Sequence, residues 1–166
     1  MAGPIIHEAD QASEAPNRVP WPPILFGAAI LAGLALGTLA PAPAWLDGPI
    51  LRGLGWALVA AGITLDLTAA ITMWRSRANI LPHRPATALV TSGPFAWSRN
   101  PIYLGNTTAL CGAGLAFANP WLIVAGLTAA AAVHRLAIVR EEAHLARLFG
   151  ADWDAYRRRT PRWLVW

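Results

Sequence analysis

The chain has 166 residues and a formal net charge of +4, with 55% hydrophobic and only 13% charged residues. Soluble domains carry about 25% charged residues, so this composition argues against an ordinary soluble domain and indicates a membrane protein. All 13 basic residues are Arg. Because they flank apolar stretches, we expect them to meet anionic lipid headgroups or an anionic ligand, and we expect no nucleic-acid partner.

The length is enough for one domain, which we place at residues 21–166. Residues 1–20 carry acidic side chains and His7 before Arg18. They lack the basic start and apolar core of a signal peptide. We therefore interpret 1–20 as a disordered or interfacial N-terminal lead.

Four apolar stretches predict transmembrane helices, since about 20 apolar residues cross a bilayer core. They run over residues 21–40, 49–74, 101–117 and 120–139. The last two are joined only by Ala118-Asn119-Pro120, so they must form an antiparallel hairpin. The expected fold class is all-α, an integral membrane helical bundle of about four transmembrane helices with a cytoplasmic amphipathic C-terminal segment.

Two features inside the apolar stretches can each be interpreted in two ways. Gly33 and Gly37 lie four residues apart, which either allows close helix packing or is simply tolerated on a lipid-facing helix. Asp66 is an ionisable residue inside a span. It is either a functional residue or a helix–helix contact.

The distribution of Arg predicts the orientation in the membrane. Arg residues gather after the second and fourth apolar stretches, and the positive-inside rule places both regions in the cytoplasm. We expect an integral protein of a bacterial inner membrane whose two termini and functional site are cytoplasmic.

The C-terminal segment carries apolar side chains at helical spacing. They are Leu145, Leu148, Phe149, Trp153 and Tyr156. Gly150 is expected to break this segment into two helices, and the apolar face then packs on the bilayer surface or covers the polar insert.

The polar insert, residues 75–100, contains several residues that are suited to binding or catalysis. Gly93-Pro94 predicts a turn, and Pro101 is well placed to begin the next helix. Free amides at that helix start, with Arg99, could hold an anionic group such as a carboxylate. Tyr103 lies one turn further along and could offer its ring to a cation.

The adjacent carboxylates Glu141 and Glu142 follow the fourth apolar stretch. They point about 100° apart on a helix, so we expect one to face the site and the other to face water. Regular spacing places His134 on the face of Glu141. No second His has the spacing of a zinc helix, so we expect no metal.

These motifs together resemble the isoprenylcysteine carboxyl methyltransferase family and its phospholipid methyltransferase relatives. The resemblance rests on Leu-Val-Thr-Ser-Gly-Pro-Phe (89–95), Arg-Asn-Pro-Ile-Tyr-Leu-Gly (99–105), Glu-Glu-Ala-His-Leu (141–145), Phe-Gly-Ala-Asp-Trp-Asp-Ala-Tyr (149–156) and Pro-Arg-Trp (161–163). It covers roughly residues 80–163. The motifs occur in order and at matching spacing.

The resemblance implies an integral membrane methyltransferase that uses S-adenosylmethionine, held in a cytoplasmic pocket by about residues 80–163. The implied cofactor-binding residues are Thr87, Ala88, Leu89, Val90, Phe95, Asn100, Pro101, Ile102, Tyr103 and Glu141. We assign catalytic roles to Arg99 and Glu141. The acceptor is expected to be lipophilic or small: a prenylcysteine-like carboxylate, a phospholipid amine or a thiol.

Two positions depart from the family pattern. Asn100 stands where the family usually has His, and Asn cannot take a proton at neutral pH. Ala137 stands where the prenylcysteine enzymes have a substrate-facing Arg, and Arg140 or Arg135 could substitute for it. We place Arg140 and His134 on the substrate side. The alternatives are an NADPH-dependent membrane reductase of the steroid-reductase-like type and a non-enzymatic membrane subunit.

Overall fold

The computed structural model describes residues 21–40, 42–78 and 88–164. The expected lead at 1–20 and the candidate Thr87 lie outside these ranges. Every regular element within them is helical, which confirms the all-α prediction. In chain order they are α2 (Trp21–Leu39), η1 (Ala44–Leu46), α3 (Pro49–Arg75), η2 (Gly93–Ala96), α4 (Pro101–Ala116), α5 (Pro120–Val133), η3 (His134–Ile138) and α6 (Val139–Arg159).

Among the described residues, three helices are long and apolar enough to cross a membrane: α2, α3 and the continuous helix Pro120–Arg159. The third expected span, 101–117, forms as α4 with nearly the expected bounds but has only 16 residues. Its length is about 24 Å at 1.5 Å per residue, against a bilayer core of about 30 Å. The four apolar stretches therefore form helices as predicted, but among the described residues three helices, and not four, are long enough to cross a membrane.

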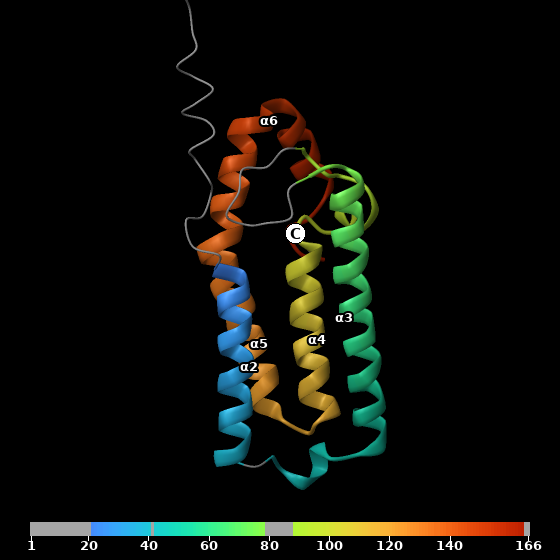
Figure 1. Cartoon of the computed structure of the whole chain (residues 1–166), viewed down its shortest axis with the longest axis vertical. Helices are drawn as coiled ribbons and strands as arrows, with labels where there is room; N and C mark the ends of the chain where they lie inside the picture. Colours follow the sequence, from blue (N-terminus) through green and yellow to red (C-terminus); the bar gives the residue numbers. More distant parts are fainter. Residues whose placement is uncertain (1–20, 41, 79–87, 165–166) are drawn as a thin grey trace, which may run out of the picture.

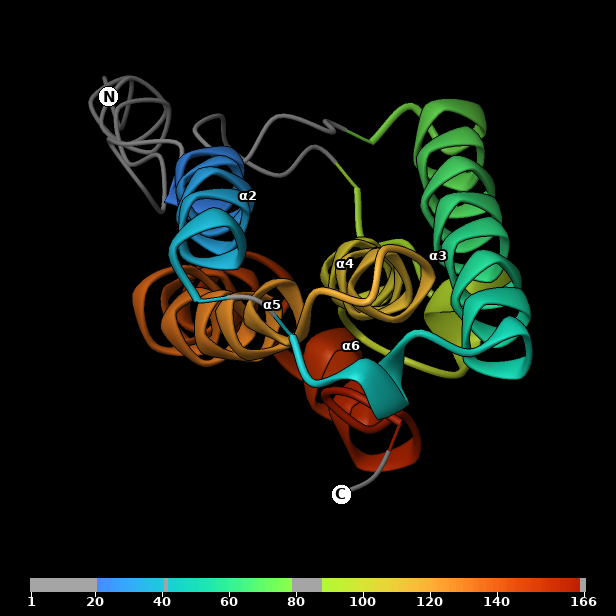
Figure 2. The same ribbon diagram turned by 90° about the horizontal axis from the view of Figure 1, so that it is seen from below.

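The helices are arranged as an arc of neighbours. α3 packs on α4, α4 on α5, and α5 on α2, and Figure 2 shows α4 between α3 and α5. The outer faces of α2 and α3 carry large exposed apolar side chains: Leu31, Leu39, Ile50, Leu67 and Trp74. Exposed apolar surface of this extent needs an apolar surrounding, and a lipid bilayer provides it.

Glycines hold α3 and α4 in backbone contact. A Cβ added at Gly62 would lie 2.6 Å from the carbonyl oxygen of Gly105, and one at Gly112 would lie 2.7 Å from the amide of Val59. Small residues permit this approach between membrane helices. Gly33 plays the same part between α2 and α5, where its Cβ would lie 2.7 Å from Leu122 Cδ2. The structure thus favours the close-packing interpretation of Gly33.

Asn119 joins the α4–α5 hairpin to α2. Its side chain accepts a hydrogen bond from the Trp121 amide at 3.0 Å, which caps α5, and donates one to the Gly33 carbonyl at 3.0 Å. The indole of Trp121 donates to the Ala40 carbonyl at 2.8 Å. The short connection therefore forms the expected hairpin and also ties it to the end of α2.

The last helix rises beyond the rest of the bundle and then turns back (Figure 1). The reversal occurs at Gly150, whose φ of 47° and ψ of −116° are not helical. This confirms the expected break. Beyond it, Trp153 and Tyr156 are buried, and the Tyr156 hydroxyl donates to the Phe95 carbonyl at 2.7 Å. Of the two expected placements, this part of the segment covers the insert.

Candidate functional site

The insert is anchored on the end of α3. Gly93 has a φ of 59°, a left-handed conformation that glycine adopts without steric cost, and Pro94 follows it as the second residue of η2. A Cβ at Gly93 would lie 3.0 Å from Thr72 Oγ1. The predicted turn is therefore present, and it sets the insert close against α3. The residues leading to it, Ala88, Leu89 and Val90, are half-buried.

The start of α4 is enclosed by the insert. Asn100 has a φ of −132° and a ψ of 54°, as expected for a residue held out of the α region by a following proline. Asn100 and Pro101 are both buried. The Asn100 amide donates to Ser98 Oγ at 3.1 Å, and the first helical bond runs from the Leu104 amide to the Asn100 carbonyl at 3.0 Å.

This start leaves two backbone donors in the first turn. The amides of Ile102 and Tyr103 precede the first helical bond, and such amides have no acceptor within their own helix. They carry the positive end of the helix dipole, which favours an anion. The structure therefore has the donors that the sequence predicted at this position.

Tyr103 and Glu141 meet between α4 and the first turn of α6. The Tyr103 hydroxyl donates to the Glu141 carboxylate, at 3.0 Å from Oε1 and 3.3 Å from Oε2. Both residues are half-buried. The fold thus brings into direct contact two residues that lie 38 positions apart in the chain. The sequence had assigned both to the same site.

Glu142 does not face water, which corrects the sequence-based expectation. Its carboxylate pairs with Arg99 Nη1 at 2.9 Å and with Arg162 Nη2 at 2.5 Å, and its side chain is only 14% exposed. The two Arg residues make this burial possible, because a buried carboxylate needs charged partners. Arg99 also lies 5.6 Å from the centre of the Trp153 ring.

The pKa values of Arg99 and Arg162 are shifted in opposite directions. Burial lowers the pKa of the Arg99 guanidinium, and the charge of Glu142 opposes this effect. Hydrogen bonding to Glu142 raises the pKa of Arg162, and burial partly offsets it. Arg99 Nε is buried and has no hydrogen-bond partner among the described residues, so Arg99 keeps one donor for another group.

The two residues assigned to the substrate side lie in different surroundings. His134 lies in η3, a π-helical turn, with Nε2 at 3.3 Å from Arg162 Nη1 and Nδ1 accepting from Trp163 Nε1 at 3.2 Å. Arg140 is exposed. Sequence reasoning gave no role to Arg162 or Trp163, although the Pro-Arg-Trp motif that contains them was the available signal.

Asp66 packs at the α3–α4 contact. Its carboxylate lies against Gly105, where a Cβ would overlap it. Asp66 Oδ1 is buried and has no hydrogen-bond partner in the described part of the chain. Within that part, no three His, Cys, Asp or Glu residues are grouped closely enough to hold a metal ion.

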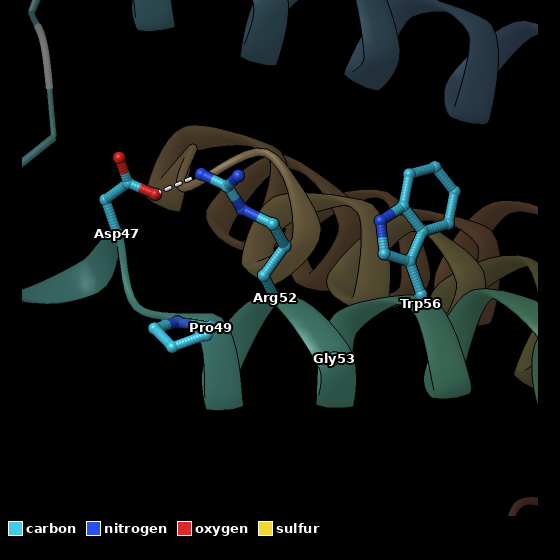
Figure 3. Close-up of a pocket in the computed structure, with 5 residues that line it drawn as sticks. All are labelled: Asp47, Pro49, Arg52, Gly53 and Trp56. Carbon is cyan, nitrogen blue, oxygen red and sulfur yellow. Dashed lines mark hydrogen bonds and ion pairs between the residues drawn. The ribbon is translucent and has the colours of Figure 1, made fainter.

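An open hollow of about 520 Å³ lies at the opposite end of the bundle from the insert. Figure 3 shows the residues that line it: Asp47, Pro49, Arg52, Gly53 and Trp56. Asp47 and Arg52 form an ion pair there and are both largely exposed. None of the predicted site residues lines this hollow, so it does not belong to the site at the insert.

These features describe a helical membrane protein with a polar, carboxylate-containing candidate site at one end of its bundle. The family model for phospholipid methyltransferases matches residues 50–152, more than half of the chain. The chain belongs to this family. The match begins in α3 and ends just after Gly150, so it contains the insert, α4 and both carboxylates but not Arg162, which contacts Glu142.

One similar curated protein is the nickel-cobalt-cadmium resistance protein NccN of Alcaligenes xylosoxydans xylosoxydans. It is 37% identical to this chain over 78 residues. The alignment covers 47% of this chain and 36% of that protein. The chain therefore matches only about a third of this relative's length.

Proposed function

We propose that this chain is a membrane-embedded, S-adenosylmethionine-dependent methyltransferase acting on a lipophilic or small acceptor. The observation that carries the proposal is the contact between Tyr103 and Glu141 beside the enclosed start of α4. Membership of the phospholipid methyltransferase family supports methyl transfer over the reductase and the non-enzymatic subunit. The acceptor is a prenylcysteine-like carboxylate, a phospholipid amine or a thiol.

The residues at the insert fit the chemical groups of the cofactor. When bound, S-adenosylmethionine supplies an activated methyl group on a positively charged sulfonium. The half-buried carboxylate of Glu141 accepts its hydrogen bond from the neutral hydroxyl of Tyr103, so in its ionised form it can attract a cation. The first-turn amides of α4 suit a carboxylate. Arg99 Nε, which is buried and has no hydrogen-bond partner among the described residues, adds a donor nearby.

The protein's contribution to catalysis is then orientation and exclusion of water. Holding the reacting groups in line supplies much of the rate of a displacement reaction, and a dry site strengthens the electrostatic contacts. The segment beyond Gly150 covers the insert through Trp153 and Tyr156. The insert and both termini are proposed to face the cytoplasm, with an apolar acceptor arriving from the bilayer.

The test uses the full chain, purified in lipid nanodiscs, and measures dissociation constants for S-adenosylmethionine, S-adenosylhomocysteine and NADPH. We expect both adenosyl compounds to bind. Glu141→Gln should weaken S-adenosylmethionine binding by about tenfold or more and S-adenosylhomocysteine binding less, because only the former carries the sulfonium charge. Asp154→Asn, which alters a surface carboxylate paired with Arg157, is the matched control.

Binding of NADPH without either adenosyl compound would refute the methyltransferase proposal and favour the reductase. Equal losses for the two adenosyl compounds in Glu141→Gln would place Glu141 away from the sulfonium. A labelled-methyl transfer screen across extracted lipids, prenyl thiols and small thiols then identifies the acceptor. Transfer to none of them in a chain that binds the cofactor would favour a non-enzymatic role.

A further inference from the structure

The segment Thr160–Trp163, here called the C-terminal strap, is bound to the insert mainly through its main chain. The Arg99 amide donates to the Pro161 carbonyl at 2.9 Å. The Asn100 side-chain amide donates to the Arg162 carbonyl at 2.9 Å. Since Asn100 immediately precedes the first residue of α4, the strap holds the residue that sets where this helix begins.

The Arg162 side chain extends the strap to the last helix. Its Nε and Nη2 form a two-pronged contact with the Glu142 carboxylate, at 2.9 and 2.5 Å. Such paired contacts fix geometry as well as adding energy. The same guanidinium approaches His134 at 3.3 Å, and Trp163 stacks on the His134 ring with centres 6.5 Å apart.

The π turn explains why His134 and Glu142 lie on the same face. In a regular α-helix, residues eight apart differ by about 80° around the axis. The wider turn of η3 (His134–Ile138) offsets this rotation by roughly one residue, or about 100°. Regular spacing had instead paired His134 with Glu141. The π turn therefore directs His134 and Glu142 to Arg162 and leaves Glu141 to Tyr103.

We propose that Arg162 is a positioning residue for the cofactor site. Its side chain contacts Glu142, the residue next to Glu141. Its main-chain carbonyl accepts a hydrogen bond from Asn100 at the start of α4. The α4 start and the first turn of α6 carry Tyr103 and Glu141, so Arg162 sets the separation of these two groups. This inference rests on the proposed function, because it assigns Arg162 a role at the cofactor site proposed there.

The Arg162 side chain can be removed without leaving a buried charge unpaired. Glu142 keeps Arg99 at 2.9 Å, and the bond from Asn100 goes to the Arg162 main chain. Arg162→Met is therefore expected to fold. Arg157→Met is the matched control, since Arg157 is an exposed Arg on α6 whose ion pair, within the described residues, is with Asp154 and whose charge reaches Arg99 only through space.

The test measures S-adenosylhomocysteine binding by calorimetry on the full chain in nanodiscs, together with the melting temperature. In Arg162→Met we expect the dissociation constant to rise about tenfold, with unchanged stoichiometry and a melting temperature close to that of Arg157→Met. Arg162→Lys should recover part of the affinity, since it keeps one of the two contacts with Glu142. With an active acceptor, the KM for the cofactor should rise while kcat at saturation changes little.

A purely structural role predicts a different pattern. Global destabilisation would lower the melting temperature and the fraction of binding-competent protein while leaving the dissociation constant unchanged, and this result would overturn the proposal. An unaltered dissociation constant in a fully folded Arg162→Met would also overturn it. The wild-type chain separates the two proposals: if it binds no adenosyl compound, both fail, whereas if it binds normally, only the role of Arg162 is in question.

Discussion

The glycine contact between α3 and α4 makes a sharp prediction about stability. In Gly62→Ala the new Cβ would lie 2.6 Å from the Gly105 carbonyl oxygen and 2.7 Å from the Ala109 amide. Both are backbone atoms, so neither can rotate away, and the two helices must separate. Gly53→Ala is the matched control on the same helix, because its Cβ would meet nothing within 4 Å.

The control isolates the packing cost. Replacing Gly by Ala inside a helix stabilises it by about 0.5–1 kcal/mol, and this gain is common to both variants. Overpacking costs about 1–3 kcal/mol and applies only to Gly62→Ala. The difference between the variants is therefore about 1–3 kcal/mol. At about 2–4 °C per kcal/mol for a chain of this size, their melting temperatures should differ by about 2–12 °C.

The assay is thermal unfolding of both variants in the same detergent, followed by circular dichroism. Cofactor affinity is measured in parallel, since Tyr103 lies on α4 two residues before Gly105 and should move with the helix. We expect Gly62→Ala to melt below the wild type and below Gly53→Ala, and to bind S-adenosylhomocysteine more weakly. A Gly62→Ala chain that melts as high as Gly53→Ala would refute the direct contact between the two helices.

Three further changes test other parts of the fold. Gly150→Ala forces a side chain into a conformation with φ of 47° and ψ of −116°, which costs about 1–3 kcal/mol, and should lower the melting temperature. Asn119→Ala removes the α5 cap and the bond to the Gly33 carbonyl, so a loss of about 1–2 kcal/mol is expected; a melting temperature equal to that of the wild type would contradict it. Tyr156→Phe breaks the bond to a carbonyl of the insert and should speed hydrogen exchange of the insert amides, whereas unchanged exchange would show that this bond does not hold the insert in place.

Much of the candidate site could be anticipated from local sequence. Pro101 begins α4, as a proline at the first helical position should, and Gly150 breaks the last helix at the expected residue. The resemblance of the motifs also directed attention to Tyr103 and Glu141, which the structure brings into contact. These features follow from backbone sterics or from short motifs, so they can be predicted without knowing which residues lie nearby in the folded chain.

The roles of the two carboxylates were harder to assign. The sequence indicated that Glu141 and Glu142 point in different directions, and this holds, but it expected one of them to face water. Instead Glu142 is enclosed by Arg99 and Arg162. The pair with Arg162 spans 20 residues, and no local pattern specifies it.

By itself the sequence determined the all-α membrane architecture, the hairpin at Asn119 and the break at Gly150. Apolar length, proline and glycine act locally, so their effects can be read along the chain. Only the tertiary structure decided the π turn that directs His134 to Arg162 and the binding of the C-terminal strap to Asn100. Both depend on contacts between residues far apart in the chain, and their energy exists only when the helices are packed together.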